Sequence, residues 1–143
     1  MIEIDAELVL AELNAIVARA ASAGPILELI GQSEVENARG RIQQTKVNPW
    51  GGDWAPWAES TEYSRERKGT AGQGLLWDRG DLLDSIHFAI TGESVEIGSD
   101  LEYARYLQEG TEGMPARPFL GWSEHALPFY EQLWINYLQT GVP

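Results

Sequence analysis

The sequence predicts a single α+β domain over residues 1–143, and three patterns predict it. Apolar residues recur at helical spacing in the first part of the chain, apolar and polar residues alternate around residues 85–97, and an aromatic-rich helical pattern follows Ser123. The expected order is two N-terminal helices, a small antiparallel β-sheet, a short helix and a C-terminal helix. The 143 residues fit one domain, because domains commonly contain ~100–200 residues.

The first helix is predicted over residues 5–21. Asp5 is a good N-cap, because its side chain can accept hydrogen bonds from the free N–H groups of the first turn. The apolar residues that keep helical spacing are Val9, Leu13, Ile16 and Ala20.

A second helix is predicted from Pro25 to about Gln44, because proline is favoured in the first turn of a helix. Its apolar seam consists of Leu27, Val35, Ala38 and Ile42. Gly31 allows a neighbouring element to approach closely. The connection Ser22-Ala23-Gly24 is short, so we expect the two helices to pack side by side.

Residues 45–74 are predicted to form a long and partly mobile loop. Glycine and proline recur through it and break any long element. Trp50, Trp54 and Trp57 lie within it, and loop tryptophans can stack on nucleic-acid bases. That mode needs interleaved Arg and Lys, which are missing around these tryptophans. We therefore favour anchoring in the core or in a subunit interface, because Trp buries a large area with one polar group.

Ordered structure is predicted to return after Leu75. Asp81 is expected to cap a short turn. Residues 85–90 and 95–97 alternate like two strands on either side of the turn at residues 91–94, which predicts a β-hairpin.

Two helices are expected after the hairpin. The first spans Leu101 to Glu109 and ends at Gly110, because glycine readily adopts the left-handed conformation that ends helices. The second, aromatic-rich helix runs from Ser123 to about Gln139.

The net charge is −12, of which −7 falls in residues 75–112, whereas residues 45–74 are balanced. Affinity for DNA rests on neutralising phosphates with Lys and Arg, so sequence-specific nucleic-acid binding is not expected. The charge can simply keep the protein soluble. It can also form a surface that DNA passes without sticking, or one that meets a basic partner.

Cellular context follows from what the sequence lacks. It has no cysteine, which excludes disulfides and thiolate metal sites and suits a reducing cytoplasm. Residues 1–5 are acidic where an export signal would be basic. The longest apolar runs fall far short of the ~20 residues that span a bilayer, so no membrane partner is expected.

No residue set predicts an enzyme, a cofactor or a metal. Ser85 and His87 near Asp84 suggest a triad, but adjacent residues of a strand point to opposite faces, which argues against one hydrogen-bonded chain. His87 and His125 lie on different elements without ligand-like neighbours. The glycine-rich residues 69–74 lack the Gly-Lys-Ser/Thr of a phosphate loop.

Two further candidates for chemistry are weak. Asp78, Asp81 and Asp84 lack the order of an EF-hand, and capping or solvation explains them better. Glu66-Arg67-Lys68 with Asp53 upstream matches half of a nuclease motif, but the strand context of that motif is missing.

Two phrases of the chain follow one another in a familiar order. They are Trp54-Ala55-Pro56-Trp57 with Ser60-Thr61, and Asp78-Arg79-Gly80-Asp81-Leu82-Leu83-Asp84-Ser85-Ile86. The first resembles the "W-x-P-L … S-T" region, and the second the "t-G-x-L-x-x-S-i", of the phage virion morphogenesis family of tail-completion proteins.

Three later phrases continue the resemblance. Val95-Glu96-Ile97-Gly98-Ser99 and then Tyr103-Ala104 with Gly110 look like the family's "v-x-i-G-s … Y-A-x-x-h-q-x-G". Pro115-Ala116-Arg117-Pro118-Phe119-Leu120-Gly121 matches its "P-A-R-P-F-L-G". The likeness covers residues 45–125. Tyr103 to Thr111 is also similar to the head–tail neck component family of long-tailed phages, with Leu107 where the first family often has His.

The resemblance implies a structural virion protein, not an enzyme, that completes the tail or joins it to the head. It implies a homo-oligomeric ring, with six subunits favoured over twelve, that contacts other neck or tail-tube proteins of the virion. Such a protein would reside in the tail or neck and be assembled in the bacterial host cytoplasm. The alternatives are an acidic inhibitor that mimics DNA to occupy a host nucleic-acid enzyme, and a hydrolytic tail enzyme.

The resemblance also implies which residues serve structure and assembly. They are Trp54, Trp57, Gly80, Leu82, Gly98, Tyr103, Gly110, Arg117, Pro118, Phe119 and Leu120. We expect Tyr103, Phe119 and Leu120 to be structural anchors. We expect Arg117 to pair with a carboxylate, either within the subunit or across the ring. In a ring, the acidic residues 75–112 would line the inner wall, and residues 45–74 would reach a neighbouring subunit or ring.

Overall fold

The computed structural model describes residues 5–123 and 125–143. Its elements are α1 (Ala6–Ala20), α2 (Gly24–Gly40) with its π-helical end η1 (Arg41–Thr45), α3 (Glu59–Lys68), the 3-10 turn η2 (Ala71–Gln73), α4 (Asp81–Ser85), β1 (Ile86–Thr91), β2 (Ser94–Ser99), α5 (Glu102–Glu109) and α6 (Leu127–Thr140). The α+β prediction is confirmed.

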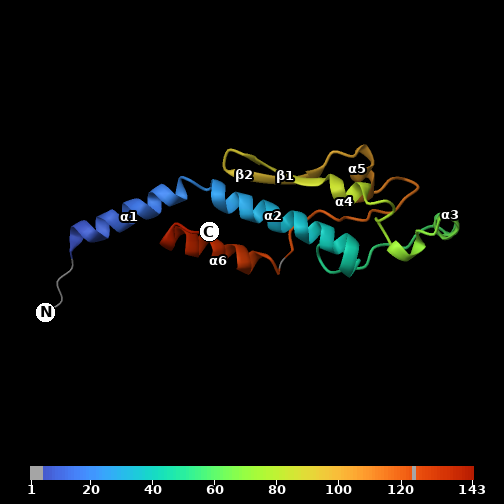
Figure 1. The fold of residues 1–143 in the computed structure, drawn as a ribbon, viewed down its shortest axis with the longest axis horizontal. Coiled ribbons are helices and arrows are strands. Elements are labelled where there is room, and N and C mark those ends of the chain that lie inside the picture. The colour runs from blue at the N-terminus through green and yellow to red at the C-terminus, as the bar shows by residue number, and fades with distance from the viewer. Residues whose placement is uncertain (1–4, 124) are drawn as a thin grey trace.

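The central element of the fold is α2. The β1–β2 hairpin, α4 and α5 lie along one side of it, and α6 lies along the other side (Figure 1). The α1 end and the α3 end stand at opposite ends of an elongated molecule. This arrangement places the first and last helices together and leaves both ends exposed.

Apolar side chains form two clusters, one on each side of α2. The larger cluster joins α2 to Trp54, α4, β1, α5 and Phe119. The smaller cluster joins Ile26 and Ile30 of α2 to Tyr130 and Tyr137 of α6. The predicted apolar seam of α2 is buried in the structure, because this helix is covered from both sides.

Gly31 sets the distance between α2 and the hairpin. A Cβ atom placed on Gly31 would lie 2.4 Å from Cδ2 of Phe88 on β1, closer than side chains pack. The predicted role of Gly31 in a close approach is confirmed, and the element that approaches is β1.

The predicted hairpin is also confirmed. β1 and β2 are antiparallel, with Ile86 paired to Ser99 and Thr91 paired to Ser94. Gly92, which has a φ of 62°, and Glu93 form the turn. A two-residue turn that begins with a positive φ matches the right-handed twist of the strands.

A polar network buried in the fold ties three segments together. The Tyr130 hydroxyl on α6 donates to Oε1 of Glu34 on α2. Arg41 faces the same carboxylate at 3.8 Å and donates from Nη1 to the Phe119 carbonyl at 3.2 Å. Burial and the hydrogen bond to Glu34 raise the pKa of Tyr130 to about 12, and burial lowers the pKa of Arg41. Each charge in the network therefore has a partner.

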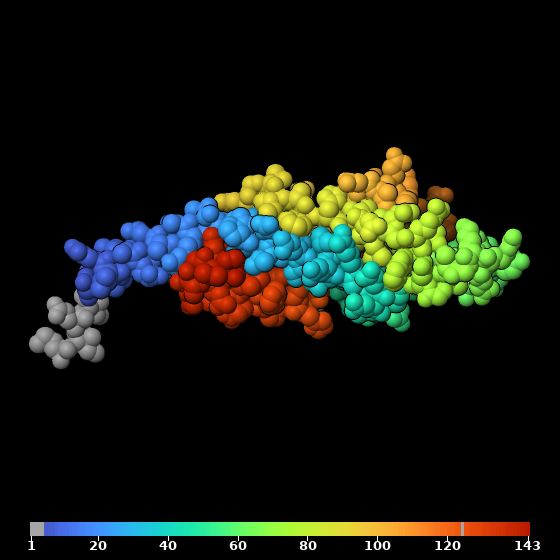
Figure 2. Space-filling model, in the orientation of Figure 1, coloured from blue at the N-terminus to red at the C-terminus, as the bar shows by residue number. Residues whose placement is uncertain are grey.

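The prediction that the first two helices pack side by side is wrong. α1 continues away from α2 at a bend of 47° (Figure 1). Ala21 and Ala23 keep right-handed helical dihedrals, so the connection does not reverse the chain. α1 contacts α6 instead: Arg19 Nη1 donates to the carbonyls of Leu138 at 2.7 Å and Gln139 at 3.0 Å. In the space-filling view, α1 projects from the body (Figure 2).

No single helix of the described chain is long and apolar enough to cross a membrane. The bent pair formed by α1 and the α2–η1 helix passes that test by length and composition.

The prediction of one continuous loop over residues 45–74 is wrong for α3 and for the short turn η2. Glu59 and Glu62 lie in the first turn of α3, and basic residues lie in its last turn, which suits the helix dipole. Gly69, with a φ of 72°, ends the helix. The order of charges along residues 59–68 therefore favours a helix, although glycines lie on both sides of this segment. Its mobility stays a prediction.

Two helix starts also differ from the predictions. Gly80, not Asp81, is the N-cap of α4, and Asp81 makes no capping hydrogen bond there. The last helix begins at Leu127, four residues after Ser123, with Pro128 in its first turn. Both helix starts depend on the local backbone conformation, which cannot be predicted from the pattern of apolar residues.

Candidate assembly site

Two of the predicted phrases, residues 54–57 and residues 115–121, contact each other in the structure. Arg117 is buried, with 6% of its surface exposed. Its Nε donates to the Ala55 carbonyl and its Nη2 to the Pro56 carbonyl, both at 2.7 Å. We call the contact between residues 54–57 and residues 115–121 the clasp. It holds a loop without regular hydrogen bonding against the core.

Within the described residues of the subunit, the Arg117 side chain bonds to carbonyl oxygens and not to a carboxylate, so that part of the prediction is wrong. A carboxylate partner across the ring stays a prediction. Ala55 and Pro56 lie in an extended segment whose carbonyls need donors. A planar guanidinium can serve two of them at once. Burial lowers the pKa of Arg117.

Trp54 and Phe119 form the apolar side of the clasp. Trp54 is buried and donates from Nε1 to the Pro118 carbonyl at 2.7 Å. Phe119 is fully buried in the larger cluster, against which Leu120 packs. These four residues from two predicted phrases therefore meet in space.

Gln108 supports the clasp by binding the backbone of residues 119 and 120, and residue-by-residue reasoning did not identify it. Its Oε1 accepts hydrogen bonds from the backbone N–H groups of Phe119 and Leu120, both at 3.0 Å, and its Nε2 donates to the Leu120 carbonyl at 2.8 Å. The side chain acts as a strand partner for an extended segment. Its place in the Tyr103–Gly110 phrase was the available signal.

The three predicted glycines have different surroundings. Gly110 has a φ of 77°, and a Cβ atom there would lie 2.7 Å from the Ala116 backbone nitrogen. It therefore lets α5 end against the clasp. Gly80 precedes α4. Gly98 pairs with His87 in the hairpin, and nothing in the structure explains a need for glycine there.

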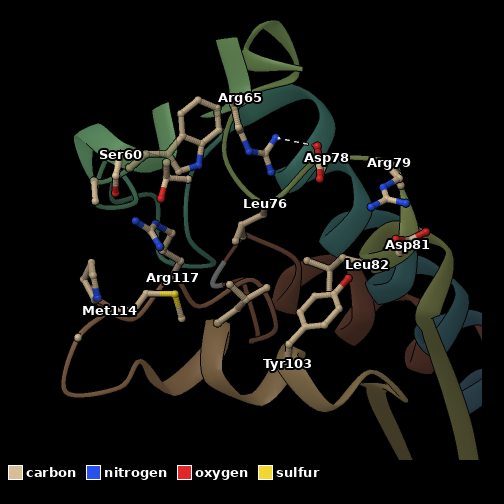
Figure 3. Close-up of a pocket in the computed structure, with 17 residues that line it drawn as sticks. Ser60, Arg65, Leu76, Asp78, Arg79, Asp81, Leu82, Tyr103, Met114 and Arg117 are labelled. Atoms are coloured by element: carbon tan, nitrogen blue, oxygen red, sulfur yellow. Dashed lines mark ion pairs between the residues drawn. The ribbon is translucent and has the colours of Figure 1, made fainter. Parts of the chain in front are cut away.

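A pocket of 650 Å³ opens beside the clasp, between α3, α4 and α5 (Figure 3). Leu76, Leu82, Tyr103 and Met114 contribute apolar surface to it. Ser60 and Arg65 line its α3 side. Leu82 is itself buried in the larger cluster. Asp78, Arg79, Asp81 and Arg117 also line the pocket, so it offers both apolar and charged side chains to a group from outside the subunit.

Tyr103 lies near the start of α5, as expected. Its ring lines the pocket, and 44% of its surface is exposed. Its role as a structural anchor stays a prediction. Partial burial and the carboxylates of Asp81 and Asp78 raise the pKa of its phenol.

Arg65 fixes α3 to the pocket. Its guanidinium lies 4.7 Å from the ring centre of the half-buried Trp57, and Nη1 donates to the Trp77 carbonyl at 2.5 Å. The same nitrogen lies 3.7 Å from Oδ1 of Asp78 (Figure 3). These contacts stabilise a helix that contributes no buried residue of its own.

The residues considered for catalysis make local contacts. Ser85 Oγ donates to the Leu82 carbonyl and lies 2.7 Å from Ser99 Oγ, and His87 Nδ1 lies 2.9 Å from the Ser85 carbonyl. Over residues 5–123 and 125–143, His, Asp and Glu form no group of three that could hold a metal.

Comparison with known proteins identifies the class to which this fold and site belong. A model of the phage virion morphogenesis family matches residues 4–139, nearly the whole chain, and the chain belongs to that family. The family indicates a structural role in a phage virion. The comparisons with curated proteins and with solved structures give no match.

Proposed function

We propose that this protein completes the tail or joins it to the head, as one subunit of a homo-oligomeric ring. Membership of the virion morphogenesis family supports a structural role. The observation that supports a ring is the exposure of α1. The structure describes all of this helix, and none of its residues is buried although it is rich in leucine and valine. Such a helix gains stability only when another surface covers it.

The acidic surface supports a passage for the genome. Asp78, Asp81, Asp84, Glu93, Glu96, Asp100 and Glu102 belong to the segment of charge −7. This segment contains the hairpin, α4 and α5, which all lie on one side of α2 (Figure 1). An inner wall of this charge repels phosphate, so DNA passes without binding.

The α3 end supplies the outward contact. α3 projects at the end of the molecule farthest from α1 (Figure 1) and carries Arg67 and Lys68. In this proposal it meets a neighbouring subunit or an adjoining neck or tail-tube protein. The protein then resides in the tail or neck of the virion, after assembly in the bacterial host cytoplasm.

Light scattering of the purified protein tests the ring. The expected result is a species with six times the subunit mass of 15.9 kDa, and twelve times that mass also fits a closed ring. A monomer at all concentrations contradicts the proposal and favours the alternative, an acidic inhibitor that mimics DNA.

A further inference from the structure

The apolar face of α1 is a continuous stripe. Leu10, Leu13 and Val17 follow one another at helical spacing, and 58%, 53% and 66% of their surfaces are exposed. Arg19, near the C-terminal end of the helix, donates hydrogen bonds to α6. The stripe is thus presented on a helix that the subunit supports at one end.

The subunit cannot cover this stripe with its own pocket. The pocket beside the clasp lies between α3, α4 and α5. These three helices lie toward the end of the molecule opposite α1 (Figure 1). A contact between α1 and the pocket therefore joins two copies head to tail. A head-to-tail contact uses two different surfaces, and repetition of it closes a ring when the rotation permits.

Charge selects the pocket over a second α1 as the partner of the stripe. Glu7, Glu12 and Arg19 give α1 a formal charge of −1, and Arg19 contacts both Glu12 at 3.4 Å and the Leu138 carbonyl of α6. Pairing two α1 helices would bring two negatively charged helices together, which is unfavourable. The charged residues that line the pocket are Arg65, Arg79 and Arg117 with Asp78 and Asp81, a formal charge of +1. Arg67 and Lys68 lie outside the lining and are exposed in the last turn of α3. Opposite charges on the two surfaces favour their association and fix its direction.

We propose that α1 of one copy docks its apolar stripe into the pocket between α3, α4 and α5 of the next copy. This contact deepens the proposed ring and rests on it. Leu13 lies at the centre of the docked face, and Met114 lies on the receiving side. Glu7 approaches the basic end of α3.

Cross-linking tests the contact directly, because the chain contains no cysteine of its own. Leu13→Cys in one preparation is mixed with Met114→Cys in another, unfolded and refolded together, and treated with a short bis-maleimide. We expect a covalent dimer in the mixture and none with either variant alone. Glu96→Cys on β2 replaces Met114→Cys in the control mixture. If Met114→Cys fails to fold, Thr61→Cys offers another pocket residue.

The outcomes separate the contact from the ring. A dimer with Leu13→Cys alone, or an assembled protein without the mixed dimer, overturns the contact and leaves the ring intact. A wild-type monomer by light scattering overturns both.

Charge reversal gives an independent readout. Glu7→Lys and Lys68→Glu should each lower the yield of the mixed dimer roughly fivefold, and together they should restore it. Equal loss in the double variant contradicts the proposed direction of docking.

Discussion

Replacing Arg117 by alanine should lower the free energy of unfolding by about 3 kcal/mol. The side chain is buried and donates two hydrogen bonds at 2.7 Å, to the carbonyls of Ala55 and Pro56. A hydrogen bond from a charged donor contributes ~1.5–3 kcal/mol, and two of them give ~3–6 kcal/mol. We take the lower end, because burial of the guanidinium costs part of the gain and lowers its pKa.

Urea denaturation followed by tryptophan fluorescence measures this loss, since Trp54 lies in the clasp. Arg117→Lys keeps the charge but cannot serve two carbonyls with one planar fork, so it should fall between the wild type and alanine. Arg105→Ala is the matched control, because this arginine is exposed and, among residues 5–123 and 125–143, its ion pair is with Glu109 on the same helix. If Arg117→Ala were as stable as Arg105→Ala, the clasp would not hold the fold.

Three further changes test the rest of the core. Phe119→Ala should cost ~3–5 kcal/mol, because a fully buried phenylalanine leaves a cavity, and an unchanged melting temperature would contradict its place in the core. Gly31→Ala should cost about 1–3 kcal/mol by thermal melting, and the loss should shrink when Phe88→Ala removes the ring that the new Cβ meets. Tyr130 has a pKa of about 12, above the ordinary value of 10.0, so its contribution to stability is complete below pH 10 and is lost as pH rises to 12. The wild type should therefore lose more stability than Tyr130→Phe between pH 10 and pH 12 in urea titrations, and parallel losses would refute this role.

Spacing predicted those parts of the fold that depend on local pattern. The N-cap at Asp5, the seam of α2, the hairpin and the glycine that ends α5 all follow from residues that act on their own neighbours. The direction of α1 could not be predicted, because it depends on the backbone conformation of the short connection. Ala21 and Ala23 keep helical φ and ψ angles there, so the chain does not turn back.

The site was predictable in its members and less so in its contacts. The two phrases around Trp54 and Phe119 were identified by resemblance, and the structure brings them together. The partners of Arg117 within the described subunit are backbone carbonyls, which carry no signal in the sequence, so sequence reasoning favoured a carboxylate in their place.

The location of the protein in the virion tests the central claim most directly. Glu131→Cys places a single thiol on the exposed surface of α6, where a maleimide–gold label can be attached in purified phage particles. Electron microscopy should then show the label at the head–tail junction or at the head-proximal end of the tail. Label spread over the capsid, or particles without label although the variant protein was produced, would contradict the account.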